Sequence, residues 1–133
     1  MKGIILAGGT GSRLYPLTKV TNKHLLPIGS FPMIHYPIIS MTNAGIDEIM
    51  IISGTGHVGD MIAFLGSGNE YDCQFTFKVQ DKPDGIAGAL KLCQNFVHDD
   101  SCLVILADNI FERDLSKDVE NFNCDAKLFF FFF

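Results

Sequence analysis

Short apolar runs alternate along this chain with longer segments of helical periodicity. An apolar run without alternation is typical of a strand buried on both faces of a parallel sheet. The sequence predicts such strands at 3–7, 48–53 and 101–107. The segment 73–80 alternates instead, with Phe75, Phe77 and Val79 on one face, and predicts a further strand.

The segments between these strands favour helices. The longest is expected from Pro32 to Ala44, with Ser30 as its N-cap, Pro37 as a kink and Gly45 as its end. Further helices are expected at 60–65, 85–96 and 115–122. Strands and helices thus alternate, which implies a three-layer α/β fold with a mostly parallel sheet and helices on both faces. Ligands of such sheets bind at the carboxyl ends of strands, near a switch point.

Composition narrows the class of protein. The 133 residues, 47% hydrophobic and 19% charged, predict a single domain over 1–133 and exclude disorder as the main state. A net charge of −5 without a basic block argues against nucleic acid or an anionic membrane as the main partner. No apolar run approaches the roughly 20 residues of a membrane span, and no signal-peptide pattern precedes the first strand. We therefore expect a cytoplasmic location.

Four cysteines are widely spaced within apolar segments. They are Cys73, Cys93, Cys102 and Cys124. Their spacing does not match a metal-binding motif, so we expect buried, reduced thiols, with a structural metal site or disulfides as the alternative.

A glycine-rich loop, GGTGSR at 8–13, directly follows the first expected strand. Bare backbone N–H groups at the carboxyl end of a parallel strand form a natural anion site, and Arg13 adds a cation that can hold two phosphate oxygens. The alternative is a tight turn with a solvent-exposed arginine. A dinucleotide fingerprint fails because Leu14 occupies its third small position, and a Walker A loop fails because Ser12-Arg13 follows the last glycine.

Three other polar residues are expected near this loop, each with an ordinary alternative. Asp108 directly follows the strand 101–107 and places a carboxylate at the rim of the sheet, although it could equally cap a following helix. Gln80 ends the strand 73–80. Its side-chain amide suits the edge of a nucleobase, and the alternative is a turn residue whose side chain bonds the backbone. Lys23 lies in a proline-bounded loop and is otherwise an ordinary surface lysine.

Taken together, four segments closely resemble the sugar nucleotidyltransferases. The segments are 6–14, 23–27, 79–87 and 108–111, and the resemblance extends over essentially the whole chain. It implies a Rossmann-like nucleotidyltransferase fold and transfer of a nucleotidyl group to a sugar 1-phosphate, with release of pyrophosphate. The family members that use dTTP and glucose 1-phosphate are the most similar, and UTP remains an alternative to dTTP.

The resemblance also implies roles for individual residues. Arg13 would hold the departing pyrophosphate, Lys23 would neutralise the α-phosphate and the attacking oxygen, and Asp108 would bind Mg²⁺. The implied nucleotide-binding residues are Leu6, Gly8, Gly9, Gly11, Ser12, Gln80 and Gly85. Among them, Gln80 and Gly85 would read the pyrimidine edge, and Leu6 would pack on the base or sugar.

The chain departs from the family pattern at several places. Ala107 stands where a glycine is usual, and His24 stands where many relatives have glutamine. Relatives continue beyond this point with the sugar-binding segments, so the chain resembles a truncated, nucleotide-binding half. The alternative function is therefore a non-catalytic nucleotide-binding domain. The tail 129–133, five phenylalanines, fits a further strand, or a surface that drives self-association into a homo-oligomer.

Overall fold

A five-stranded sheet forms the centre of the protein, which we describe from a computed structural model over residues 1–9, 11–19, 21–122 and 128–131. Its strands are β1 (Lys2–Ala7), β4 (Glu48–Gly54), β5 (Gln74–Gln80), β6 (Cys102–Leu106) and β7 (Leu128–Phe131). Their order is β5-β4-β1-β6-β7, and each neighbouring pair that the structure describes is parallel. The four strands expected from apolar patterns are confirmed to within a residue or two, and β7 confirms a further strand at the start of the phenylalanine tail.

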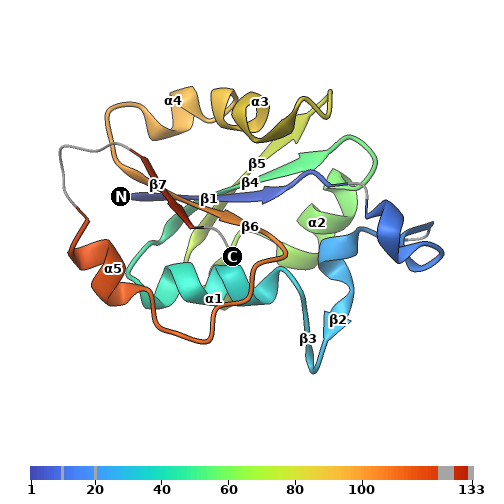
Figure 1. Ribbon diagram of the computed structural model, residues 1–133, viewed down its shortest axis with the longest axis horizontal. Coiled ribbons are helices and arrows are strands. Elements are labelled where there is room, and N and C mark those ends of the chain that lie inside the picture. Colours follow the sequence, from blue (N-terminus) through green and yellow to red (C-terminus); the bar gives the residue numbers. More distant parts are fainter. Residues whose placement is uncertain (10, 20, 123–127, 132–133) are drawn as a thin grey trace.

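Helices cover both faces of this sheet, as Figure 1 shows. They are α1 (His35–Asn43), α2 (Val58–Leu65), α3 (Gly85–Lys91), α4 (Gln94–Val97) and α5 (Ser116–Glu120). Helices α1, α2 and α5 lie on one face, and α3 and α4 lie on the other. The expected three-layer α/β fold is therefore confirmed.

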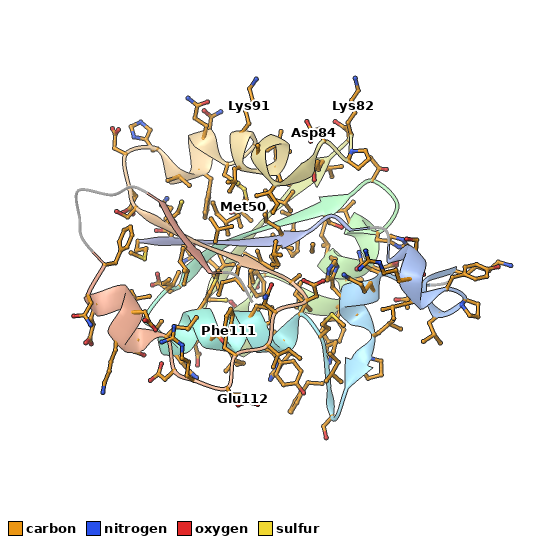
Figure 2. All side chains as sticks on the ribbon, in the orientation of Figure 1. Met50, Lys82, Asp84, Lys91, Phe111 and Glu112 are labelled. Atoms are coloured by element: carbon orange, nitrogen blue, oxygen red, sulfur yellow. The ribbon has the colours of Figure 1, made fainter. Side chains whose placement is uncertain are left out.

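Side chains of β1 contribute alternately to two hydrophobic cores, one on each face of the sheet. Ile5 belongs to the core beneath α1, and Ile4 belongs to the core beneath α3 and α4. Both are almost fully buried, as expected for a strand with neighbours on each side and helices on each face. Figure 2 shows Met50 of β4 on the side of α3 and α4, and Phe111 on the opposite face. The middle strand of the sheet is thus buried on both faces.

The first long helix begins later than expected. Its expected start, Pro32, instead lies in β3 (Phe31–Pro32), which pairs with β2 (Pro27–Ile28) in a two-stranded antiparallel hairpin. Ser30 consequently lies in the hairpin turn and does not cap α1. Gly29 in the same turn adopts a φ of 63°, which glycine tolerates and other residues resist.

The expected kink at Pro37 is also wrong, for the same reason. Because α1 begins at His35, Pro37 lies in its first turn, where the backbone N–H has no partner within the helix. Proline therefore removes no hydrogen bond at this position, and α1 continues to Asn43.

The expected helix 85–96 is divided into α3 and α4. The amides of Leu92 and Cys93 donate to carbonyls three residues earlier, at 3.0 Å each, which tightens the helix and ends α3. Helix α2 begins two residues before its expected start, and α5 is shorter than its expected range of 115–122. Four 3₁₀ turns complete the described elements: η1 (Ser12–Leu14), η2 (Leu17–Lys19), η3 (Lys23–Leu25) and η4 (Asn69–Tyr71).

The described cysteines are buried free thiols, as expected. They are Cys73, Cys93 and Cys102, whereas Cys124 lies outside the described residues, as do 132–133 of the tail. Burial raises the pKa of the Cys73 thiol to about 11 and that of the Cys93 thiol to about 12, so both stay protonated at neutral pH. Within the described part of the chain, no helix is both long and apolar enough to cross a membrane.

The close approach of α1 to β1 gives a test of the packing. A Cβ added at Gly3 would lie 2.6 Å from Sδ of Met41 and 3.1 Å from Cγ1 of Ile49. Gly3→Ala should therefore lower the free energy of unfolding by about 1–3 kcal/mol, measured by urea denaturation. Gly59→Ala is the control, because an added Cβ there meets nothing within 4 Å and should raise helix stability by about 0.5–1 kcal/mol. An unchanged urea midpoint for Gly3→Ala would contradict this packing.

Candidate functional site

The order of the sheet reverses between β1 and β6. From β1 the chain proceeds outward to β4 and β5 on one side, then returns to place β6 on the other side of β1. Loops that leave neighbouring strands in opposite directions open a crevice at their carboxyl ends, where α/β proteins bind ligands. The glycine loop follows β1 at this point, and Asp108 follows β6.

A cavity of about 310 Å³ occupies this crevice. Its lining residues are Leu6, Gly8, Gly9, Lys23, His24, Gln80, Pro83, Gly85, Ile86, Ala89, Leu106 and Asp108. The structure therefore brings together residues from four separate parts of the sequence, and most of the predicted site residues are among them. Three of the predicted residues are not in the lining: Gly11, Ser12 and Arg13.

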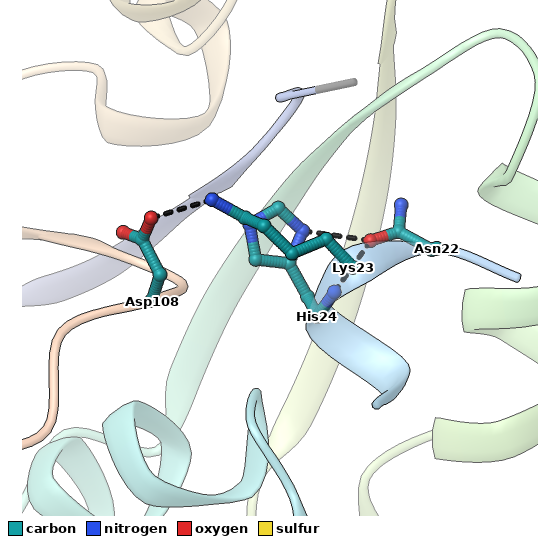
Figure 3. A network of polar contacts seen from close by, with 4 residues as sticks. All are labelled: Asn22, Lys23, His24 and Asp108. Atoms are coloured by element: carbon teal, nitrogen blue, oxygen red, sulfur yellow. Dashed lines mark hydrogen bonds and ion pairs between the residues drawn. The ribbon is translucent and has the colours of Figure 1, made fainter. Parts of the chain in front are cut away.

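Lys23 and Asp108 face each other at the cavity wall. Lys23 lies on η3, and its Nζ donates to Oδ2 of Asp108 at 2.6 Å (Figure 3). Burial alone would raise the pKa of the Asp108 carboxyl, but the hydrogen bond and positive charge of Lys23 hold this pKa below its ordinary value. The alternative role of Asp108 as a helix cap is wrong, because the next described helix begins only at Ser116.

A buried histidine adjoins this ion pair. His24 is 2% exposed, and its Nδ1 lies 2.7 Å from Oδ1 of Asn22, which also accepts from the His24 backbone N–H at 2.8 Å. Burial, and then the charge of Lys23, lower the pKa of His24 to about 4, against an opposing effect of Asp108. The imidazole is therefore neutral at physiological pH. Its Nδ1–H donates to Asn22, which leaves Nε2 as an acceptor.

Two glycines of the loop are closely packed against other elements. A Cβ at Gly8 would lie 2.9 Å from Oε1 of Gln80. Gly11 adopts a φ of 62°, and a Cβ there would lie 2.7 Å from Cγ2 of Thr18 and 2.8 Å from Cβ of Lys23. The loop is thus held against the two elements that carry Gln80 and Lys23, and a larger residue would separate them.

Gln80 lines the cavity and also bonds the turn that follows β5. Its Nε2 donates to Oδ1 of Asp84 at 2.6 Å and to the backbone carbonyl of Gly85 at 3.2 Å. The expected alternative, a turn residue that bonds the backbone, is therefore present. It does not exclude ligand binding, because the Gln80 side chain remains in the cavity wall.

Arg13 and Ser12 lie away from the cavity. Both are exposed on η1, and no ion pair of Arg13 occurs among the described residues. In this arrangement Arg13 matches the alternative of a solvent-exposed arginine. Backbone bonds from the turns η1 and η2, together with the Thr18 hydroxyl donating to the Gly11 carbonyl at 3.0 Å, hold the segment in this position.

Some lining residues were not found by sequence reasoning. Ile86 and Ala89, one helical turn apart on α3, add apolar side chains to the cavity lining, as does Pro83. Their position in the helix that follows the end of β5 was a usable signal, because α/β proteins bind ligands at the carboxyl ends of strands. Asn22 holds His24 because its side-chain oxygen accepts from the His24 backbone N–H, which is the usual role of asparagine before a helical turn.

The cavity can therefore hold a ligand with an anionic end and a flat, apolar end. Lys23 and the bare amides at Gly8 and Gly9 suit the anion, and the wall of Leu6, Ile86 and Ala89 suits a ring. Among the described residues, no group of three or more His, Cys, Asp or Glu side chains could hold a metal ion without further ligands. A single carboxylate such as Asp108 does fit Mg²⁺ that takes its other ligands from phosphate oxygens and water.

Comparison with known proteins agrees with this geometry. The family described as nucleotidyl transferase matches residues 2–132. A glucose-1-phosphate thymidylyltransferase of Neisseria meningitidis is 41% identical over 111 residues, which cover 84% of this chain and 38% of that protein. The nucleotidyltransferase Agl11 of low-salt glycan biosynthesis in Haloferax volcanii is 38% identical and is matched over 92% of this chain and 34% of its own length.

Solved structures give the same result. A Bacillus anthracis structure assigned as a glucose-1-phosphate thymidylyltransferase, in complex with sucrose, superposes with a TM-score of 0.88 and 59% identity, over 90% of this chain and 49% of that chain. A UDP-glucose pyrophosphorylase complexed with UDP-glucose shares the fold, with a TM-score of 0.72 and 24% identity over 90% of this chain and 52% of its own. This chain spans about a third to a half of the proteins it matches. The resemblance drawn from four sequence segments is confirmed, and the chain belongs to the nucleotidyl transferase family.

Proposed function

We propose that the cavity between β1 and β6 binds a nucleoside triphosphate, dTTP or UTP, and that the whole protein joins it to glucose 1-phosphate with release of pyrophosphate. The observation that carries the proposal is the Lys23–Asp108 pair at the cavity wall, directly beside the bare glycine loop. The names of the matched relatives support the reaction class and the choice of dTTP and glucose 1-phosphate.

The transfer requires charge neutralisation more than covalent chemistry. A sugar 1-phosphate oxygen attacks the α-phosphorus, the bond from this phosphorus to the bridging oxygen breaks, and pyrophosphate leaves. Negative charge is concentrated where two phosphates meet, so a fixed cation contributes strongly. Lys23 fits this role because it lies beside the glycine loop. Its Nζ is 4.0 Å from the position that a Cβ of Gly9 would take. The loop amides would hold the triphosphate.

Asp108 fits a Mg²⁺ ion that is shared with the nucleotide. The ion would supply further positive charge where the phosphates carry negative charge. Before a ligand binds, Lys23 occupies one oxygen of Asp108. Triphosphate binding would draw the Lys23 ammonium toward the α-phosphate and free this carboxylate oxygen.

Arg13 has a proposed role that requires movement. It lies outside the cavity lining, so holding the departing pyrophosphate requires the segment 12–19 to approach the glycine loop. The bond from the Thr18 hydroxyl to the Gly11 carbonyl, which holds this exposed segment in place, would have to break or move with the segment.

Substitution of Lys23 tests the proposed role of its charge. With dTTP, glucose 1-phosphate and Mg²⁺, pyrophosphate release should fall by about 100-fold or more in Lys23→Ala, because one fixed cation at the transferring group is lost. Lys117→Ala is the matched control, since Lys117 is an exposed lysine on α5 outside the cavity lining, and should retain most of the activity. Removal of Mg²⁺ with a chelator should abolish release in all variants.

Two outcomes would contradict this proposal. Equal activity of the parent chain and Lys23→Ala would remove Lys23 from the reaction. Failure of the parent chain to bind dTTP would remove the cavity from nucleotide binding, whereas binding without pyrophosphate release would select the alternative of a non-catalytic nucleotide-binding domain for this chain.

The buried His24 should make the stability of the protein depend on pH. The folded-state pKa of about 4 lies below the ordinary value of 6.5, so the unfolded chain takes up a proton first as the pH falls. The contribution of His24 to the free energy of unfolding is therefore fully present above about pH 6.5 and is lost as the pH falls toward 4. From pH 7 to pH 5 the free energy of unfolding should fall by about 2 kcal/mol through His24.

Urea unfolding at pH 7 and pH 5 measures this effect. The loss should be smaller in His24→Gln and unchanged in the control His98→Gln, because the His98 side chain is 80% exposed. Some loss should remain in His24→Gln, since burial also lowers the pKa of His35. An equal loss in the parent chain and His24→Gln would contradict a neutral, buried His24.

A further inference from the structure

Asp84 stands where an aspartate usually caps a helix, but it does not cap this one. It immediately precedes α3, and its carboxylate makes no hydrogen bond to the first amides of that helix. Its Oδ1 instead accepts from Nε2 of Gln80 at 2.6 Å. Figure 2 shows Asp84 on the face of the sheet that α3 covers. The carboxylate is therefore directed back toward the end of β5.

The first turn of α3 leaves space for this carboxylate. A Cβ added at Gly88 would overlap the carboxylate atoms of Asp84. A side chain at position 88 would therefore displace Asp84 from Gln80. Glycine in a helix interior costs about 1 kcal/mol relative to alanine, so its presence here indicates a packing requirement.

These contacts determine which way the Gln80 amide faces. Its Nε2 donates to two groups that can only accept, the carboxylate of Asp84 and the carbonyl of Gly85. The amide therefore cannot turn over without losing both bonds. Its Oε1 lies 2.9 Å from the position that a Cβ of Gly8 would take, and both residues line the cavity. Gln80 thus presents an acceptor to a ligand at this place.

We propose that Asp84 is a positioning residue that fixes Gln80 with its amide oxygen toward the cavity and thereby favours bases that offer a ring N–H. The inference rests on the proposed function, because it assumes that the cavity holds the base. Thymine and uracil carry a donor at N3, whereas N3 of cytosine is an acceptor. A fixed acceptor facing N3 accordingly binds thymine and uracil and repels N3 of cytosine. An amide that turns freely could instead present a donor to cytosine.

Two variants test this by different routes. Asp84→Asn removes the charge and lets the new amide pair with either orientation of Gln80. Gly88→Ala keeps both Asp84 and Gln80 but fills the space that the carboxylate occupies, and alanine is well tolerated in a helix. Asp81→Asn is the control, because it removes the same charge from the exposed turn after β5.

The measurement is the dissociation constant of the chain for dTTP and for dCTP, each with Mg²⁺, by isothermal titration calorimetry. In both variants the preference for dTTP over dCTP should fall about tenfold, as expected for one discriminating hydrogen bond. The direction of the two affinity changes is decisive: in both variants dTTP should bind more weakly and dCTP more tightly. Asp81→Asn should keep the preference of the parent chain.

Each other result has a defined meaning. If the parent chain prefers dTTP and both variants keep that preference, or lose affinity for both nucleotides equally, Asp84 does not position Gln80 and this inference fails while the proposed function stands. If the parent chain binds neither nucleotide, the proposed function fails and this inference fails with it.

Discussion

Parallel pairing of β1 with a neighbour on each side is the constraint on which the whole site depends. Leu6 is level with Ile52 of β4 and with Leu106 of β6. The three strands therefore end together, and the segments that follow them begin at the same edge of the sheet. The glycine loop and Asp108, about 100 residues apart in the sequence, meet here because of this register. The two buried cores hold the register by fixing both faces of β1.

The ion pair at this edge contributes little to stability. Asp108 is 40% exposed and Lys23 is 20% exposed, and pairs open to solvent are typically worth about 0–1 kcal/mol. A weak pair is easily exchanged for stronger partners, such as a phosphate for the lysine and Mg²⁺ for the carboxylate. The same residues are thus held near their proposed working positions before a nucleotide arrives, at small cost to its binding. The neutral His24 beside them adds no charge that would disturb the exchange.

The strands and the strand-end residues could be predicted from the sequence because they depend on local patterns. A continuous apolar run specifies a strand buried on both faces, and the position directly after it must lie at the sheet edge. The start of α1 could not be predicted in this way, because pairing of Phe31–Pro32 with Pro27–Ile28 overrides a helical periodicity that begins at Pro32. The break between α3 and α4 has no proline or glycine signal at Leu92–Cys93.

Residue-level contacts were harder to predict than elements. Nothing in the local sequence indicates that Asp84 turns from its helix to Gln80, since an aspartate before a helix ordinarily caps it. Arg13 was expected at the site both from its place beside the glycine loop and from family resemblance, whereas the structure places it outside the cavity lining. The binding of Mg²⁺, the cytoplasmic location and self-association through the phenylalanine tail stay predictions.

The central claim is that the edge between β1 and β6 is a nucleotide site. Amide chemical-shift mapping by NMR during titration with dTTP and Mg²⁺ tests it most directly. The largest, saturable shifts should fall on Gly8, Gly9, Lys23, Gln80 and Gly85, which surround the cavity. A second hollow, of about 390 Å³, lies between α1 and the segment 111–115. Shifts concentrated around that hollow, or no saturable change at the glycine loop, would contradict the claim.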